Sequence, residues 1–331
     1  MSPLRYLSAA AVRAAMPPVE ERLELARRTM VGLVADAELP PKFGVHPRQP
    51  ESHSAAMPAL LRGAAKSGED DLFGVKWVTA FADNRQIGLP AIHATVILND
   101  PVTGVPLAIL DGAPITAERT AAVSGVALRE WWPDVAGPAS VALLGAGVQG
   151  ASHLDVLAHV APGSALTIVD HGAARAEDLA TRARASGRFT TVVAGVEVEA
   201  AVAGADVVLT MISFGARRQT VAAAAFERAR LIVAVDYDMC VPAAVVARSS
   251  RFLVDDIAQF EATRSDKVFR DYPRADASIG EALLDIGPVA PSRGAGPLVV
   301  THLGVGLADV VFADAIVRRA AEMGLGTELE R

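Results

Sequence analysis

The second half of the chain is built from short apolar runs separated by mixed, more polar segments. Each run is apolar almost throughout, rather than at alternate positions. A strand with one wet face alternates apolar and polar residues, whereas a strand buried on both faces of a parallel sheet does not. The pattern therefore predicts a parallel sheet covered by helices. The predicted strands are 140–145, 165–171, 190–195, 206–213, 231–238 and 251–256.

The N-terminal third has a different pattern of apolar and polar positions. Helical spacing of apolar residues predicts a helix over 19–37, and a proline-rich loop is expected over 39–61. Three strand candidates, joined by short turns, follow it. Short strands with short connections favour an antiparallel sheet. These candidates are 73–81, 91–100 and 106–112.

Two predicted helices connect these regions. One begins at residue 115 with Thr116 as its N-cap, and a final helix over 306–324 is expected to pack back near the N-terminal part. The predicted fold class is α/β, with a Rossmann-type doubly wound parallel sheet domain. A smaller α+β domain carries the antiparallel sheet. The expected boundaries are 1–114 with 310–331 for the smaller domain and 115–309 for the Rossmann-type domain.

Composition narrows the class of protein. The chain has 331 residues, 51% of them hydrophobic, so it can bury two cores and is not expected to be disordered. Its net charge of −7, with no run of Lys and Arg, argues against nucleic acid and anionic membranes as partners. No signal-peptide pattern or membrane-length apolar window is seen, and the single cysteine, Cys240, excludes an intrachain disulfide. We expect a cytoplasmic protein without a metal site.

A glycine motif follows the first apolar run of the second half. Gly145, Gly147 and Gly150 come between the run 141–144 and a predicted helix, and a second run ends in Asp170. This context is typical of a dinucleotide site. The glycines allow a tight turn, close approach of the pyrophosphate, and close packing of helix on strand. The N-terminus of the helix provides free N–H groups for the phosphates.

The acid after the second run points to the cofactor. Asp170 would accept hydrogen bonds from ribose hydroxyls and repel a 2′-phosphate, which favours NAD, while the nearby Arg175 leaves NADP open. The nicotinamide is expected near the end of the fourth run. The further residues predicted to bind the cofactor are Val148, Gln149, Thr210, Met211 and Ser213.

Rossmann domains host many reactions, so the remaining residues must select one. A lysine in a predicted strand and an Arg-Thr-Ala-Ala helix start both lie upstream of the glycine turn. With these and with the segments 56–61, 74–112, 115–128, 143–150 and 302–316, nearly the whole chain resembles the ornithine cyclodeaminase/mu-crystallin family.

The resemblance implies roles for several residues. Lys76 and Arg119 would hold the α-carboxylate of the substrate, since a guanidinium can grip a carboxylate through two bonds while an ammonium adds charge. We also expect Lys76 to take part in catalysis. Thr120 resembles the family's contact to a cofactor phosphate.

The loop before these residues departs from the family. Lys42 stands where the family often has an arginine as a third carboxylate ligand, with Arg48 as an outside candidate. Met57 is expected to line the substrate pocket. Cyclodeaminases carry a glutamate two residues before the Met-Pro pair, and this chain has Ala55 there. A partner for a distal amine is therefore missing, which weakens the case for ornithine.

A catalytic carboxylate is expected after the fifth run. The chain offers Asp236 and Asp238 without the family's usual surrounding signature. Alignment of the strand end favours Asp238, whereas spacing from Arg119 favours Asp236. At least one of them is expected to exchange a proton with the substrate nitrogen.

These parts predict an NAD(P)-dependent oxidoreductase that transfers hydride at the α-carbon of a small imino or amino acid, as a ketimine reductase or amino-acid dehydrogenase does. An ornithine or lysine cyclodeaminase is the first alternative. A non-catalytic, crystallin-like protein that binds NAD(P) and small ligands is the second. The Rossmann domain over 115–309 is therefore expected to bind NAD(P). The resemblance also implies that the smaller domain binds the substrate and joins a homodimer through the N-terminal sheet.

Overall fold

The computed structural model describes residues 3–48, 52–215, 217–265, 268–286 and 295–330. The chain forms two compact units. The first unit comprises Met1–Arg119 and Gly304–Arg331, and the second comprises Thr120–Leu303. The first division lies inside the helix α3 (Gly112–Trp131), five residues beyond the expected boundary. Because that helix runs on without a break, no turn or linker marks the division in the sequence.

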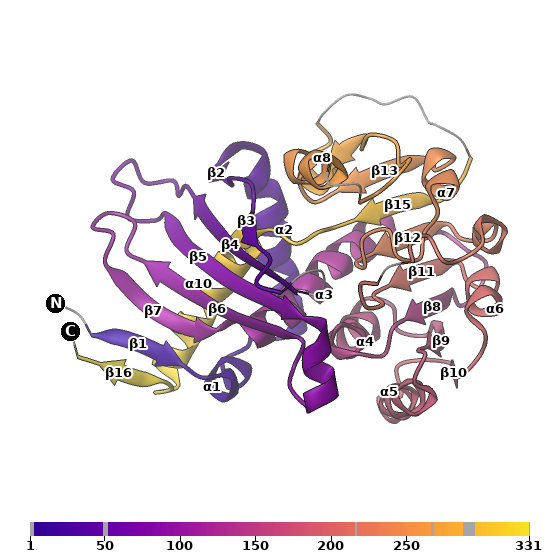
Figure 1. Ribbon diagram of the computed structural model, residues 1–331, viewed down its shortest axis with the longest axis horizontal. Coiled ribbons are helices and arrows are strands. Elements are labelled where there is room, and N and C mark those ends of the chain that lie inside the picture. Colours follow the sequence, from indigo (N-terminus) through magenta and orange to yellow (C-terminus); the bar gives the residue numbers. More distant parts are fainter. Residues whose placement is uncertain (1–2, 49–51, 216, 266–267, 287–294, 331) are drawn as a thin grey trace. The chain divides into compact units, whose positions relative to one another are not determined.

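The second unit contains a parallel sheet (Figure 1). Its strand order is β10-β9-β8-β11-β12-β15-β13-β14, and every pair in it is parallel. All six predicted strands are present, and the short β14 and the inserted β15 were not predicted. The strands are β8 (Ser140–Leu144), β9 (Ala165–Val169), β10 (Thr191–Ala194), β11 (Val207–Thr210), β12 (Leu231–Ala234), β13 (Arg251–Val254), β14 (Ala277–Ser278) and β15 (Leu298–Thr301).

The order of these strands reverses next to β8. The chain first moves outward to β9 and β10 and then returns to the other side through β11 and β12. Ligands of open α/β sheets bind at such a switch point, beyond the carboxyl ends of the strands. The helical elements of this unit are α4 (Val148–Val160), α5 (Ala173–Ala185), α6 (Val198–Ala203), η2 (Ala223–Phe226), α7 (Ala243–Ala247), α8 (Ile257–Ser265) and α9 (Ile279–Leu283).

The first unit contains a mixed sheet in the order β16-β1-β7-β6-β5-β4-β2, with β3 also paired to β4. Its pairs are antiparallel as predicted, except that β1 runs parallel to β7. The 3-10 helix η1 (Ala82–Ile87) follows β5. The strands are β1 (Leu4–Leu7), β2 (Ala37–Glu38), β3 (Phe43–Val45), β4 (Ser52–Leu61), β5 (Leu72–Phe81), β6 (Ile92–Asn99), β7 (Pro106–Asp111) and β16 (Thr327–Leu329).

The prediction of a proline-rich loop over 39–61 was wrong, because β4 fills its second half and pairs with β5 along its whole length. Pro58 is tolerated within the strand because of its position. On the far side of β4, pairing with β3 involves Ala56 and pairing with β2 involves Leu60, so Pro58 falls between the two short partners. A missing backbone N–H costs little at such an edge position.

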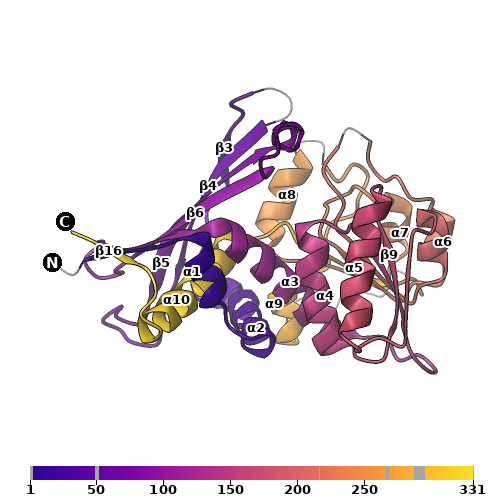
Figure 2. The same cartoon turned by 90° about the horizontal axis from the view of Figure 1, so that it is seen from below.

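Three helices accompany the sheet of the first unit: α1 (Ala9–Ala14), α2 (Val19–Ala35) and α10 (Gly306–Glu322). The final helix α10 packs against β4, β5 and β6, and α2 packs against α10 (Figure 2). The predicted N-cap at Thr116 was wrong. Helix α3 begins at Gly112, and the Thr116 hydroxyl donates to the Gly112 carbonyl inside its first turn. None of the helices in the described ranges is long and apolar enough to cross a membrane.

Apolar side chains are exposed on one face of this sheet. Gly74 of β5 packs against Val310 of α10, and side chains alternate along a strand, so Phe73 and Trp77 face away from that helix. Phe73 and Trp77 are 39% and 46% exposed. The face opposite α10 is therefore partly apolar.

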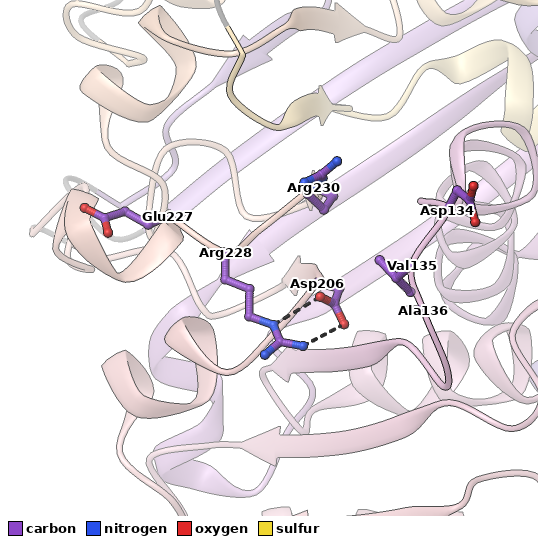
Figure 3. Close-up of a pocket in the computed structure, with 7 residues that line it drawn as sticks. All are labelled: Asp134, Val135, Ala136, Asp206, Glu227, Arg228 and Arg230. Carbon is purple, nitrogen blue, oxygen red and sulfur yellow. Dashed lines mark hydrogen bonds and ion pairs between the residues drawn. The ribbon is translucent and has the colours of Figure 1, made fainter.

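A cavity of about 460 Å³ lies at the amino ends of the strands in the second unit (Figure 3). Asp206, just before β11, accepts from the Ser140 backbone N–H at 2.9 Å and from the Arg228 Nε at 3.1 Å. These bonds join the starts of two strands. The glycine turn follows the carboxyl end of β8, so this cavity is at the opposite edge of the sheet, and we assign it a structural role.

Candidate active site

The glycine turn connects β8 to α4 in the second unit. Gly145 has a φ of +114°, and its N–H donates to the Val169 carbonyl at 2.8 Å. A Cβ at Gly145 would lie 2.7 Å from the Met211 carbonyl oxygen, so only glycine fits there. Gly147 is the N-cap of α4 and has no atom within 4 Å of an ideal Cβ. The free space beside this helix N-terminus suits a pyrophosphate.

Asp170 follows β9 and faces the same turn. One carboxylate oxygen accepts from the Ala146 N–H at 2.9 Å, and the other accepts from the Gly172 N–H at 2.7 Å and from Arg175 at 2.6 Å. Burial alone would raise the pKa of Asp170, but these hydrogen bonds bring it below the usual range. Asp170 is therefore an anion beside the turn, already paired with the arginine that the sequence marks for NADP.

The other predicted cofactor residues all lie in the second unit, at or near the carboxyl edge of its sheet or on α3. Their exposures differ. Val148 is 72% exposed at the start of α4, whereas Thr210 at the end of β11 is fully buried. Met211 and Thr120 are also buried, Gln149 is half-buried and Ser213 is exposed.

Asp236 lies just beyond β12 and is 5% exposed. It accepts from the Thr210 hydroxyl at 2.7 Å and from the Ile212 N–H at 3.2 Å. Burial raises the pKa of Asp236 to about 6, against the opposing effect of hydrogen bonds that include those two and Cys240. A carboxyl group with this pKa can both give and take a proton near neutrality.

Asp238 is equally buried but is bound differently. One of its oxygens contacts Arg218 at 2.7 Å and the other accepts from the Phe269 N–H at 3.0 Å. Each oxygen thus has a strong donor, and the carboxylate ties the segment before β12 to the segment after α8. This arrangement suits a structural anchor. Arg218, which the sequence analysis did not select, completes it.

In the first unit, the two predicted carboxylate ligands lie side by side in the interior. The side chains of Lys76 on β5 and Arg119 on α3 are 2% and 6% exposed. Both contact Asp309 of α10, with Lys76 Nζ at 2.6 Å from Oδ2 and Arg119 Nε at 3.4 Å from Oδ1. Sequence reasoning missed Asp309. The signal was a single acid within an otherwise apolar stretch, since a buried charge requires a partner.

The remaining predicted substrate residues surround Lys76 to different degrees. Met57 on β4 is buried and is the register partner of Lys76 on β5. Lys42 is half-buried just before β3, and its charge contributes to lowering the pKa of Lys76. Arg48 is exposed and makes backbone contacts with the Ser52 hydroxyl.

The sequence analysis also did not predict a buried histidine pair in the second unit. The Ser124 hydroxyl on α3 lies 2.8 Å from His153 Nε2 and 2.9 Å from His302 Nε2. His153 Nδ1 contacts the Gln149 carbonyl at 2.7 Å, so this nitrogen carries a proton. Burial lowers the pKa of His153 to about 4, so its other nitrogen accepts from Ser124, which in turn accepts from His302. The network connects α3, α4 and the end of β15.

Comparison with known proteins agrees with this architecture. A model of the ornithine cyclodeaminase/mu-crystallin family matches residues 7–236. The nodulation efficiency protein NfeD of Rhizobium meliloti is 30% identical over 331 residues, which cover 99% of this chain and 98% of that protein.

Two further proteins are similar over different lengths. The ketimine reductase mu-crystallin of Mus musculus is 33% identical over 147 residues, 44% of this chain and 45% of that protein. The structure of Thermococcus litoralis Delta(1)-pyrroline-2-carboxylate reductase in complex with NADH and L-proline has a TM-score of 0.80 at 22% identity, covering 98% and 99% of the two chains. The latter shows a shared fold. From its family match and its full-length relative, this chain belongs to the ornithine cyclodeaminase/mu-crystallin family.

Proposed function

We propose that the protein is an NAD(P)-dependent oxidoreductase that reduces a small cyclic or acyclic imino acid to an amino acid, or catalyses the reverse reaction. The observation that carries the proposal is the buried pair of Lys76 and Arg119, which among the described residues share the one carboxylate of Asp309. Two cations buried with one anion leave one positive charge for a ligand. A substrate with one α-carboxylate supplies the missing negative charge.

The second unit supplies the groups for a nicotinamide cofactor. The free space at Gly147, the N-terminus of α4 and the anion at Asp170 fit a pyrophosphate followed by a ribose that carries free hydroxyls. We infer a preference for NAD because Asp170 would repel a 2′-phosphate. When bound, this cofactor supplies or accepts the hydride at the substrate α-carbon.

The chain's own groups would perform the remaining steps. Lys76 and Arg119 bind the substrate carboxylate and orient the α-carbon, which by positioning alone can contribute several kcal/mol. Asp236, whose pKa is raised to about 6, transfers the proton at the substrate nitrogen. We assign this role to Asp236 rather than Asp238, because both oxygens of Asp238 are held by Arg218 and Phe269.

The identity of residue 55 favours reduction over cyclodeamination. Ala55 is 1% exposed on β4, two positions from Met57, and it cannot pair with a distal ammonium. The mouse relative is named a ketimine reductase, which supports the same direction.

The reaction is tested by mixing the protein with NADH and either pyrroline-2-carboxylate or piperideine-2-carboxylate and following absorbance at the nicotinamide band. We expect stoichiometric loss of NADH. Arg119→Ala should lower kcat/KM by a factor of about 30 or more, because losing one partner of a buried charge contact costs about 2–5 kcal/mol. Arg129→Ala, at the other end of α3, is the matched control. Ammonia release from ornithine with catalytic NAD would instead identify a cyclodeaminase, and NADH binding without turnover of any imino acid would identify a binding protein.

The proton donor is tested by the pH profile of reduction. Asp236 must be protonated to act as an acid, so kcat should fall as the pH rises through about 6, and the oxidative direction should show the opposite trend. Asp236→Asn should remove this limb and lower kcat by a factor of about 10²–10⁴. If the limb instead persists in Asp236→Asn and disappears in Asp238→Asn, the assignment of the two aspartates is reversed.

Cofactor choice is tested at Asp170 and Arg175. Asp170→Ala should raise the KM for NADH by about tenfold, since a hydrogen bond to a charged group contributes about 1.5–3 kcal/mol. The same change releases Arg175 and should lower the KM for NADPH. The double variant with Arg175→Ala should lose that gain. An unchanged ratio of the two KM values would rule out Asp170 as the selecting residue.

We also propose that the protein is a homodimer, joined through the face of the first unit's sheet that carries Phe73 and Trp77. Large apolar side chains exposed together on one sheet face are typical of an interface. Sedimentation equilibrium should give the mass of a dimer. Trp77→Glu should give a monomer, while Arg62→Glu, elsewhere in the unit, should remain dimeric. A monomeric wild-type protein at micromolar concentration would contradict the proposal.

A further inference from the structure

Asp309 is the fourth residue of α10 and has no solvent exposure. The residues after it, Val310 to Phe312, are fully buried as well. An ionised carboxylate in such surroundings costs several kcal/mol unless it is paired. Asp309 is therefore held in the interior by its partners, and it in turn constrains them.

The contacts divide evenly between the two oxygens of this carboxylate. Oδ2 lies 2.6 Å from Lys76 Nζ, and Oδ1 lies 3.4 Å from Arg119 Nε. The carboxylate thus bridges a cation on β5 and a cation at the first unit's end of α3. The guanidinium also lies against Gly304, where a Cβ would be 2.4 Å from Arg119 Nη1. Both head groups are fixed before any ligand arrives.

We propose that Asp309 is a positioning residue for the substrate carboxylate, which sets the spacing of the Lys76 and Arg119 head groups and keeps the ammonium of Lys76 charged. The inference rests on the proposed function and extends it to a residue with no assigned role. Because Asp309 already neutralises one of the two cations, the pair of Lys76 and Arg119 can bind one further carboxylate. Substrates with a second carboxylate near the same cations are therefore disfavoured.

The charge of Lys76 depends on its neighbours. Burial lowers the pKa of Lys76 to about 7, Arg119 and Lys42 act in the same direction, and Asp309 opposes all three. These are the charged groups that act on Lys76 from α3, from the segment before β3 and from α10. Removing the charge of Asp309 leaves only influences that favour the neutral amine, so the ammonium is lost at a lower pH.

The test compares wild type with Asp309→Asn. Pyrrole-2-carboxylate, a planar analogue that cannot be reduced, is titrated calorimetrically into the enzyme with NADH between pH 5.5 and 9. In wild type, we expect affinity to fall as the pH rises through about 7. In Asp309→Asn the fall should begin at least one pH unit lower. At pH 7.5 the KM for pyrroline-2-carboxylate should rise at least tenfold, with kcat changed less than threefold.

Two further variants separate positioning from stability. Asp314→Asn removes a carboxylate that lies on the same helix and pairs with Arg318. In this variant the affinity should still fall as the pH rises through about 7. Asp309→Glu keeps the charge but moves it, so it should retain the limb near pH 7 while weakening affinity. It also keeps the proposal testable if Asp309→Asn does not fold, as judged by thermal unfolding.

The possible outcomes distinguish the two proposals. A limb that stays at the wild-type pH in Asp309→Asn, or a loss of affinity that is equal at every pH, overturns the role of Asp309 alone. Wild-type protein that binds neither the analogue nor the imino acid at any pH overturns the proposed function together with it.

Discussion

The cluster of two buried cations around one buried carboxylate is the constraint on which the proposed chemistry depends. A lysine and an arginine in a protein interior repel one another and lose their hydration, so without a counter-ion the lysine would lose its proton and the arginine would be a costly unpaired charge. Asp309 supplies it from the final helix. The final helix α10 therefore contributes to the first unit the negative charge that the cations of strand β5 and helix α3 need.

The second unit meets a different constraint. Its central strands β8, β11 and β12 are largely buried on both faces, and the order of the strands reverses beside β8. Gly145, Asp170 and Asp236 all follow the carboxyl ends of strands, at one edge of the sheet. At the opposite edge, Asp206 joins strand starts through hydrogen bonds. The proposed binding residues and the structural contacts of Asp206 thus lie at opposite edges of the parallel sheet.

Burial gives the two adjacent aspartates different properties. Asp236 accepts from a hydroxyl and a backbone N–H, which do not compensate for its desolvation, so its pKa is raised. Asp238 has an arginine and a backbone N–H on opposite oxygens. A proton-transfer group must be able to change charge at moderate cost, whereas an anchor should not change charge at all. The neighbours decide which aspartate can serve which purpose.

Local patterns were enough to predict much of the second unit. The apolar runs predicted six of the eight strands of its parallel sheet but missed β14 and the interior strand β15. The glycine spacing predicted the turn beside Asp170, because both depend on periodicity and on short-range backbone geometry. Only the tertiary structure showed that β4 is a strand despite Pro58, since its pairing with β5 comes from outside the segment. It alone also brought Asp309 to Lys76, because residues more than two hundred positions apart meet through packing, which no local pattern encodes.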